Sequence, residues 1–235
     1  MSRSIVLVHG SRTSGSQWDP QVQRLAARGW RCVAPDLPGH GDRRDEEFTA
    51  VAAVDAIRAA LEASGEPAHL VGHSLGGMLA IHAAATHPGL VRTLTAACCS
   101  VQPSAHTAGF YGGLIRAADR LGERPVRRLL GADGAAWYLR KGRAGLDVVA
   151  ASMRAVAAFD LLADLARIPA PVTILNARVD QLRLQERRFA TVPARGRLVV
   201  LGYGTHMVNL THPERFTTDL ERVLSEADAV AATRG

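Results

Sequence analysis

The fold of this chain is decided by one stretch, Val71-Gly72-His73-Ser74-Leu75-Gly76-Gly77. An apolar run at residues 68–72 precedes it and predicts a buried strand, and a helical pattern follows at residues 75–87. A serine between two glycines at a strand-to-helix junction matches the G-x-S-x-G pattern of a nucleophile on a sharp turn. Gly72 and Gly76 leave room where a Cβ would clash. We therefore expect Ser74 to be a nucleophile and the Leu75 N–H to face an oxyanion, rather than a Gly-rich turn with a capping serine.

The rest of the chain alternates strand-like runs with helical patterns. Strands are predicted at residues 4–9, 31–35, 68–72, 91–98, 171–177 and 197–201. Helices are predicted at residues 17–28, 49–64, 75–87, 182–190 and 213–226, with a frayed tail at 227–235. Residues 101–169 show helical patterns only. We expect an α/β fold of about six mainly parallel strands with helices on both faces. The core domain should comprise residues 1–100 and 170–235, and residues 101–169 should form a short helical cap.

Composition favours one globular domain and excludes several other classes of protein. The chain has 235 residues and is 47% hydrophobic and 21% charged, which argues against a disordered chain. No apolar run approaches the roughly 18 residues that a membrane span needs. Because the first strand begins near residue 4, we expect no signal peptide.

Charge and cysteine content predict neither nucleic-acid binding nor a metal site. The formal net charge is +6, but the basic residues are dispersed without interleaved aromatics. Cys32, Cys98 and Cys99 lack the spacing of a metal site or a disulfide framework. We therefore expect buried thiols in a reducing cytoplasm, with no cofactor, no metal and no nucleic-acid or membrane partner. The oligomeric state is left open.

A serine nucleophile needs a general base and an orienting carboxylate. His206 follows the last predicted strand in a Gly-flanked loop, at the sheet edge where open α/β sheets bind ligands. His40 is the rival base, because its loop lies at the same edge. His212, at the start of the final helix, is expected to be structural. The helical histidines His82 and His87 point away from the nucleophile.

The carboxylate is expected to be Asp180, which follows the predicted strand at residues 171–177. Asp36 is the rival, although the Pro-Gly loop beside it explains it structurally. Near the first strand, Gly10 allows a sharp turn, so the Ser11 N–H is expected to be the second oxyanion donor. His9 in the same loop is expected to hold the loop by hydrogen bonds rather than to act in catalysis.

These motifs together resemble the α/β-hydrolase superfamily over residues 5–226. The matching segments are Val8-His9-Gly10 with Trp18, Asp36-Leu37-Pro38-Gly39-His40-Gly41, Gly72-His73-Ser74-Leu75-Gly76-Gly77, Pro171-Val172-Thr173-Ile174-Leu175 leading to Asp180, and Gly204-Thr205-His206. The resemblance implies the chain order of the triad, Ser74, Asp180 and His206.

Departures from the family pattern narrow the activity. The family's full sheet has eight strands, whereas this chain begins on the third, as in the small esterase and hydroxynitrile-lyase branch. Such lyases carry a hydroxyl residue where this chain has Gly10, and a lysine near the catalytic histidine. The only lysine here is Lys141, in the predicted cap. Epoxide hydrolases and dehalogenases place Asp where this chain has Ser74. The resemblance therefore favours an esterase, although the loop before Asp180 lacks the family's usual glycine.

The sequence thus predicts a cofactor-free serine hydrolase that cleaves an ester or thioester of a small, largely apolar acyl compound. C–C bond hydrolysis, or a lyase or cyclase step with the same triad, is the enzymatic alternative. A binding module is the non-enzymatic one, although receptors that abandon catalysis often lose a triad member. We expect the substrate-binding residues to be Trp18, Phe110, Tyr111, Trp137 and Tyr138.

The predicted cap is strongly basic between residues 101 and 143. This segment contains eight positive residues and three negative ones, Asp119, Glu123 and Asp133, so its formal charge is +5 and that of the whole chain is +6. A solvated cationic face with local ion pairs is one explanation. The other is that the cap receives an anionic group of the substrate, because the planar fork of Arg binds oxygens bidentately.

Overall fold

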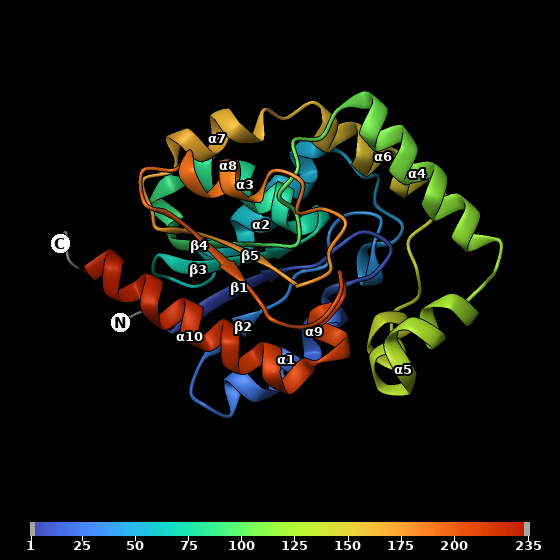
Figure 1. The fold of residues 1–235 in the computed structure, drawn as a ribbon, viewed down its shortest axis with the longest axis horizontal. Helices are drawn as coiled ribbons and strands as arrows, with labels where there is room; N and C mark the ends of the chain where they lie inside the picture. The colour runs from blue at the N-terminus through green and yellow to red at the C-terminus, as the bar shows by residue number, and fades with distance from the viewer. Residues whose placement is uncertain (1–2, 233–235) are drawn as a thin grey trace.

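The computed structural model describes residues 3–232 and contains one six-stranded parallel sheet (Figure 1). The strand order is β2-β1-β3-β4-β5-β6. The strands are β1 (Ser4–Val8), β2 (Arg31–Val33), β3 (Ala68–His73), β4 (Val91–Ala97), β5 (Val172–Asn176) and β6 (Gly196–Val200). All six predicted strands are therefore present. From β1 the chain first adds β2 on one side and then β3 on the other, so the loops after β1 and β3 meet at this switch in strand order.

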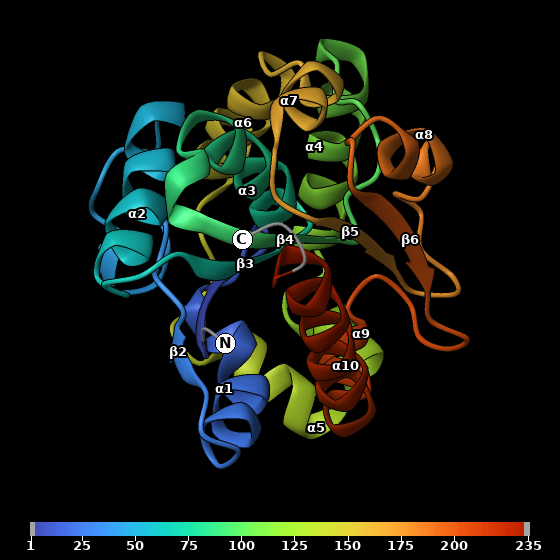
Figure 2. The same ribbon diagram turned by 90° about the vertical axis from the view of Figure 1, so that its left-hand side faces the viewer.

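Helices cover both faces of the sheet (Figure 2). One face carries α1 (Asp19–Ala26), α9 (Val208–Thr211) and α10 (Pro213–Ala232). The other carries α2 (Ala50–Glu62), α3 (Leu75–Thr86), α7 (Leu161–Arg167) and α8 (Glu186–Thr191). This two-sided cover explains why the strands read as continuous apolar runs rather than as alternating patterns.

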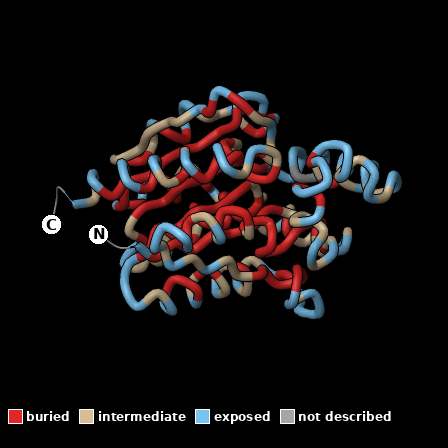
Figure 3. The backbone as a smooth tube through the Cα atoms, turned by 90° about the horizontal axis from the view of Figure 1, so that it is seen from below, coloured by how far each residue is buried: buried red, intermediate tan, exposed pale blue. Residues whose placement is uncertain are grey.

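The hydrophobic core lies on the two faces of the inner strands. Every residue of β1, β3 and β5 is buried, whereas exposed residues lie on the outer faces of the surrounding helices (Figure 3). Helix α3 is apolar all round because it lies between the sheet, α2 and α7. This packing fixes the carboxyl ends of the strands, which carry the candidate site.

The segment between β4 and β5 is helical throughout its regular structure. It contains α4 (Ala105–Asp119), α5 (Arg124–Leu139) and α6 (Leu146–Ala157), followed by α7. In Figure 1, α4 and α5 project beyond the carboxyl ends of the strands. Helix α7 instead packs against α3 beside the sheet. The division of the chain at residues 101 and 169 stays a prediction.

The structure corrects the prediction of a frayed tail. Helix α10 continues to Ala232, and residues 233–235 lie outside the described part of the chain. Ala227 and Asp228 are buried, and the Asp228 carboxylate pairs with Arg92 of β4. Tertiary contacts of this kind, which the local pattern does not show, extend the helix.

Within residues 3–232, no helix combines the length and the apolar character that crossing a lipid bilayer requires.

Candidate active site

Ser74 occupies a strained turn between β3 and α3. Its φ of 56° and ψ of −120° lie outside the regions that a residue with a side chain normally adopts. A Cβ on Gly72 would come within 2.3 Å of the Gly76 carbonyl oxygen, and one on Gly76 within 2.4 Å of the Val8 carbonyl oxygen. No side chain would fit at Gly72 or Gly76, because backbone carbonyl groups pass too close to both residues. The two glycines thus allow the sharp turn that places Ser74 at the carboxyl edge of the sheet.

His206 and Asp180 complete a hydrogen-bonded line with Ser74. The Ser74 hydroxyl lies 3.0 Å from His206 Nε2. On the other side of the ring, His206 Nδ1 lies 3.1 and 3.2 Å from the two Asp180 oxygens. With the proton on Nδ1, the imidazole donates to the carboxylate and Nε2 accepts from the hydroxyl. This is the geometry in which a histidine can deprotonate a serine.

The loops after β5 and β6 are tied together beside this line. Val179 and Thr205 form a parallel bridge, and the Val179 N–H donates to the Gly204 carbonyl at 3.1 Å. The next residue after each bridge partner is Asp180 or His206. Pairing of the two loops thus aligns the carboxylate with the imidazole.

The Asp180 carboxyl is held in its ionised form. Burial alone would raise its pKa, but the hydrogen bond and charge of His206 outweigh burial and lower the pKa to about 2. The Cys98 thiol and the Leu182 N–H also donate to this carboxylate. An ionised Asp180 can stabilise an imidazolium formed on His206.

Two backbone amides near Ser74 are the predicted oxyanion donors. Leu75 is the first residue of α3, and Ser11 follows Gly10 in the loop after β1. Neither N–H donates to another group within residues 3–232. The Ser11 hydroxyl is also buried, has no partner among these residues and borders the space above Ser74. Their role as oxyanion donors stays a prediction.

A chain of hydrogen bonds that the sequence did not predict joins the first loop to the histidine loop. The Gly10 N–H donates to Gln17 Oε1 at 2.9 Å, and Gln17 Nε2 donates to His73 Nδ1 at 3.0 Å. His73 Nε2 then donates to the His206 carbonyl at 2.7 Å. Burial, with the positive charge of a protonated His206, lowers the pKa of His73 to about 3, so its Nδ1 remains a proton acceptor. Only the position of His73 beside the nucleophile could have indicated this role.

The rival acids and bases have other partners. Asp36 accepts from the Gly15 and Asp42 amides at 2.7 and 2.8 Å and from Lys141 at 3.0 Å. His40 is buried, and its Nδ1 donates to the Pro38 carbonyl at 2.9 Å. Both belong to the structural frame of the loop after β2.

Three other histidines considered from the sequence, His9, His82 and His212, are also engaged elsewhere. His9 Nδ1 donates to the Gly10 carbonyl at 2.8 Å, and its Nε2 accepts from the Leu37 N–H at 3.0 Å, which confirms the expected structural role. His82 pairs with the buried Asp164 at 2.8 Å. His212 lies 3.0 Å from the hydroxyl of its neighbour Thr211, at the start of α10.

The space above Ser74 divides into two arms, both bordered by Ser11, Ser74, Tyr111 and Ile115. The apolar arm has a volume of about 240 Å³, and its wall includes Leu75, Met78, Phe110, Leu114, Met153 and Val156. The polar arm has a volume of about 210 Å³, and its wall includes Arg12, Asp119, Val126, Tyr138, Arg143 and His206. A substrate at Ser74 can therefore extend into two chemically different environments.

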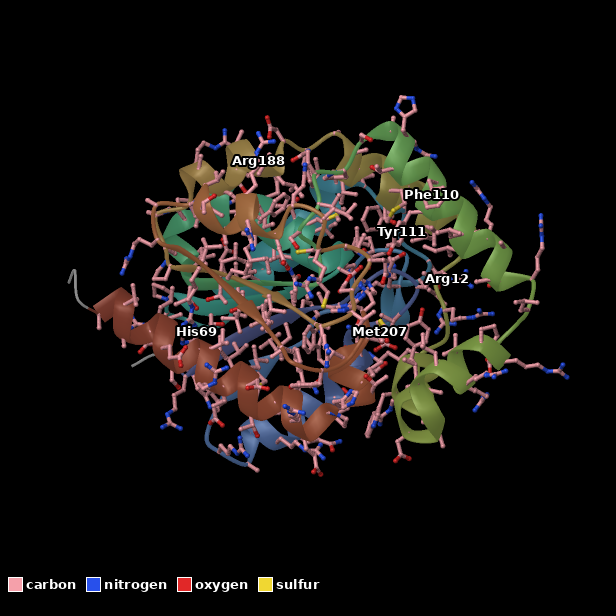
Figure 4. The ribbon with its side chains drawn as sticks, viewed as in Figure 1. Arg12, His69, Phe110, Tyr111, Arg188 and Met207 are labelled. Atoms are coloured by element: carbon pink, nitrogen blue, oxygen red, sulfur yellow. The ribbon has the colours of Figure 1, made fainter. Side chains whose placement is uncertain are left out.

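Three of the five expected substrate-binding residues border these arms. Tyr111 separates them and accepts a hydrogen bond from Gln181 at 2.6 Å. Phe110 borders the apolar arm and is 68% exposed, and Tyr138 borders the polar arm. Figure 4 shows Phe110 and Tyr111 on α4, above the edge of the sheet.

The structure places the two expected tryptophans elsewhere. Trp18 is fully buried in the core beneath the sheet, where its ring packs against Phe216 and the edge of His73. Trp137 borders neither arm, and its ring lies under the guanidinium of Arg140. The sequence pattern predicted that Trp18 lies near the site, but it could not show whether the ring points toward the cavity or into the core.

One cluster of metal-ligand types coincides with this site. The ligand atoms of His73, Cys98 and His206 lie within 4.8 Å of one another. The imidazole nitrogens already bind Gln17, Asp180, Ser74 and a carbonyl, and burial raises the pKa of the Cys98 thiol. A metal ion here would have to break the hydrogen bonds of the Ser74–His206–Asp180 line, so these residues do not fit a resident metal.

Comparison with known proteins agrees with this architecture. The model of the alpha/beta hydrolase family matches residues 5–219. A pimeloyl-[acyl-carrier protein] methyl ester esterase from Neisseria meningitidis serogroup C is 40% identical over 93 residues, which are 39% of this chain and 35% of the esterase. The enzyme of the same name from Xanthomonas campestris pv. campestris is 42% identical over 85 residues, which are 36% of this chain and 32% of that enzyme. These matches span about a third of the length of the curated relatives.

Solved structures match over almost the whole chain. A carboxylesterase from Nitrososphaera gargenis has a TM-score of 0.80 with 19% identity, covering 96% of this chain and 91% of that one. A thermophilic esterase from Thermogutta terrifontis has a TM-score of 0.77 with 20% identity, covering 96% and 90%. These likenesses establish the fold, and the family model extends from β1 into α10. The chain belongs to the alpha/beta hydrolase family.

Proposed function

We propose that this protein is a serine hydrolase that cleaves an ester or thioester of a small, largely apolar acyl compound. The observation that carries the proposal is the Ser74 hydroxyl 3.0 Å from His206 Nε2, at the point where the apolar arm opens. The methyl ester esterases among its relatives support an ester as the bond that is cleaved.

In the acylation step, Ser74 Oγ attacks the carbonyl carbon while its proton passes to His206 Nε2. The Ser11 and Leu75 N–H groups receive the oxyanion, and Asp180 stabilises the imidazolium. When the tetrahedral intermediate collapses, His206 returns the proton to the leaving alcohol or thiol. The acyl group is then attached to Ser74 and its chain lies in the apolar arm.

In the deacylation step, His206 removes a proton from water, and the resulting hydroxide attacks the acyl-enzyme carbonyl. Collapse of the second intermediate releases the carboxylic acid and returns the proton to Ser74. Each cycle consumes one water and leaves the enzyme unchanged. We propose a cytoplasmic location, because Cys32, Cys98 and Cys99 are all unpaired thiols.

A fluorophosphonate probe combined with a chromogenic butyrate ester tests this proposal. We expect a single label on Ser74, and we expect Ser74→Ala to lose labelling and to lower kcat on the order of 10⁶-fold. Ser64→Ala, in the turn between α2 and the start of β3, is the matched control and should leave both readouts unchanged. Labelling that persists in Ser74→Ala would contradict the assignment. Turnover of a diketone but not of esters would favour C–C bond hydrolysis.

A further inference from the structure

The far end of the polar arm contains a charged cluster that the proposed reaction at Ser74 does not use. It consists of Arg12 from the loop after β1, Asp119 at the end of α4, and Arg143 between α5 and α6. All three border the same cavity as Ser74. Figure 4 shows Arg12 between the ribbons of α4 and α5. We call these residues the Arg12–Asp119–Arg143 cluster.

Arg12 is held there at a conformational cost. Its side chain is only 9% exposed, and its backbone has a φ of 67°, in the left-handed region that favours glycine. The guanidinium donates to the Ala144 carbonyl at 2.7 Å and to Asp119. These two contacts use two of its five N–H donors. Strained residues of this kind concentrate where a ligand is received.

The cluster has more positive than negative charge. Arg143 also approaches Asp119, with a distance of 3.1 Å between Nη1 and the same carboxylate oxygen that accepts from Arg12. Two guanidinium groups and one carboxylate give the cluster a net charge of +1. A partly buried excess charge is costly unless an opposite charge joins it.

A phenol lies beside this excess charge. Tyr138 borders the same arm, and its hydroxyl has no hydrogen-bond partner within the described part of the chain. Burial raises the pKa of Tyr138 to about 12, although the charges of Arg12 and Arg143 act in the opposite direction. The hydroxyl therefore keeps its proton and can donate a hydrogen bond to an anion.

We propose that Arg12, Arg143 and Tyr138 form a subsite for a carboxylate carried by the leaving-group part of the substrate. A single carboxylate neutralises the net +1, and its two oxygens match the planar donors of guanidinium groups. The inference rests on the proposed function, in which the acyl chain occupies the apolar arm. The leaving alcohol or thiol then points into the polar arm and brings its carboxylate to the cluster.

Two phenyl esters that differ only at this position test the subsite. The first is 4-carboxyphenyl butanoate, and the second is 4-carbamoylphenyl butanoate, which replaces the carboxylate by a neutral amide of the same shape. The quantity to compare is the ratio of their kcat/KM values in each variant, because differences in leaving-group reactivity then cancel. Arg143→Gln should lower this ratio by about 10-fold or more, mainly through the KM of the anionic ester.

Arg140→Gln is the matched control, because Arg140 is an exposed arginine of the same region that pairs with Asp19 and borders neither arm. It should leave the ratio within about twofold of the wild type. Tyr138→Phe should lower the ratio by a smaller factor than Arg143→Gln, since it removes one neutral donor. Added salt should lower kcat/KM for the anionic ester more than for the neutral one.

An unchanged ratio in Arg143→Gln, or an equal fall in Arg140→Gln, would overturn the subsite while leaving the proposed hydrolase intact. If neither ester is hydrolysed, fluorophosphonate labelling of Ser74 decides the proposed function, and calorimetric binding of 4-hydroxybenzoate still tests the subsite. Binding to the wild type that is at least about tenfold weaker in Arg143→Gln would support it. Equal binding to both proteins, or binding to neither, would overturn it.

Discussion

The sheet edge and the helices α4 and α5, which we call the cap, both border the space above Ser74, yet they are built differently. Ser74, Asp180 and His206 stand on loops that leave fully buried or paired strands, and backbone hydrogen bonds hold those loops together. Most described residues of α4 are exposed, including Phe110 at 68% and Leu114 at 51%. The groups that we propose to move protons are thus fixed by the core, whereas the exposed helix residues that border the cavity make fewer buried contacts.

The internal structure of the cap supports this contrast. Helix α4 contains three interior glycines, and a Cβ on Gly109 or Gly113 would meet nothing within 4 Å. Each such glycine costs a helix about 1 kcal/mol relative to alanine. Helix α5 is interrupted at Gly131, whose φ of 71° is non-helical. The cap therefore draws less stability from helix propensity than an uninterrupted, glycine-free helix of the same length would.

After loss of Ser74 itself, the largest effect is expected from Asp180→Asn at the sheet edge. Loss of the carboxylate removes the partner of His206 Nδ1 and favours the wrong tautomer, so kcat should fall by up to ~10⁴-fold while the fold persists. The measurement is kcat for a butyrate ester, with circular dichroism as the check on folding. Near-normal turnover would show that another carboxylate, such as Asp36, orients the base.

A pair of leucine substitutions compares the two regions directly. Leu79 of α3 is fully buried, whereas Leu121, after α4, is 65% exposed. Leu79→Ala should lower the free energy of unfolding by about 2–5 kcal/mol through lost burial and a cavity, and Leu121→Ala by less than about 0.5 kcal/mol. Urea unfolding of both variants measures the difference. Similar losses would mean that the cap contributes as much as the core to stability.

Acid should weaken the sheet edge through its buried histidines. Burial lowers the folded-state pKa of His73 to about 3, whereas an unfolded histidine titrates near about 6.5. Between these values the unfolded state binds more protons, so this contribution to stability is complete above pH 6.5 and is lost as pH falls. From pH 7 to pH 5 the loss should be about 2 kcal/mol for this histidine.

The control is His73→Gln, whose amide can donate to the His206 carbonyl and accept from Gln17 without titrating. The difference in unfolding free energy between wild type and variant should change by the same amount over this pH range. Parallel curves for the two proteins would contradict a neutral His73 in the folded state.

The sequence predicted the strands and the Ser74–Asp180–His206 arrangement because both follow from local signals. Buried runs show the parallel strands, and glycines that no side chain could replace show the nucleophile turn. The carboxyl ends of parallel strands meet at one edge, so residues far apart in the chain could be placed together. The pairing of Val179 with Thr205 then supplies an alignment that no single motif contains.

The local sequence signals could not predict the direction of individual side chains or the pairing of residues far apart in the chain. Trp18 could face the site or the core, and only the packing of α10 decides for the core. In the sequence, Arg12 cannot be told from an ordinary loop arginine, because its partner Asp119 lies 107 residues later and is brought to it only by the fold. The helix predicted at residues 182–190 begins at Glu186 instead, because the preceding turn donates from Gln185 to the Ser100 carbonyl and from Leu182 to Asp180.

The chain of hydrogen bonds through Gln17 and His73 matters to anyone who transplants this site into a designed scaffold. The amide oxygen of Gln17 is directed to the Gly10 N–H and its nitrogen to His73, and His73 carries its proton on Nε2. A graft of Ser74, Asp180 and His206 alone would lack the hydrogen bonds that fix the distance between the Gly10–Ser11 loop and the His206 loop. A designed site would therefore need Gln17 and His73 in addition to these three side chains, together with the four chain segments that carry the five residues.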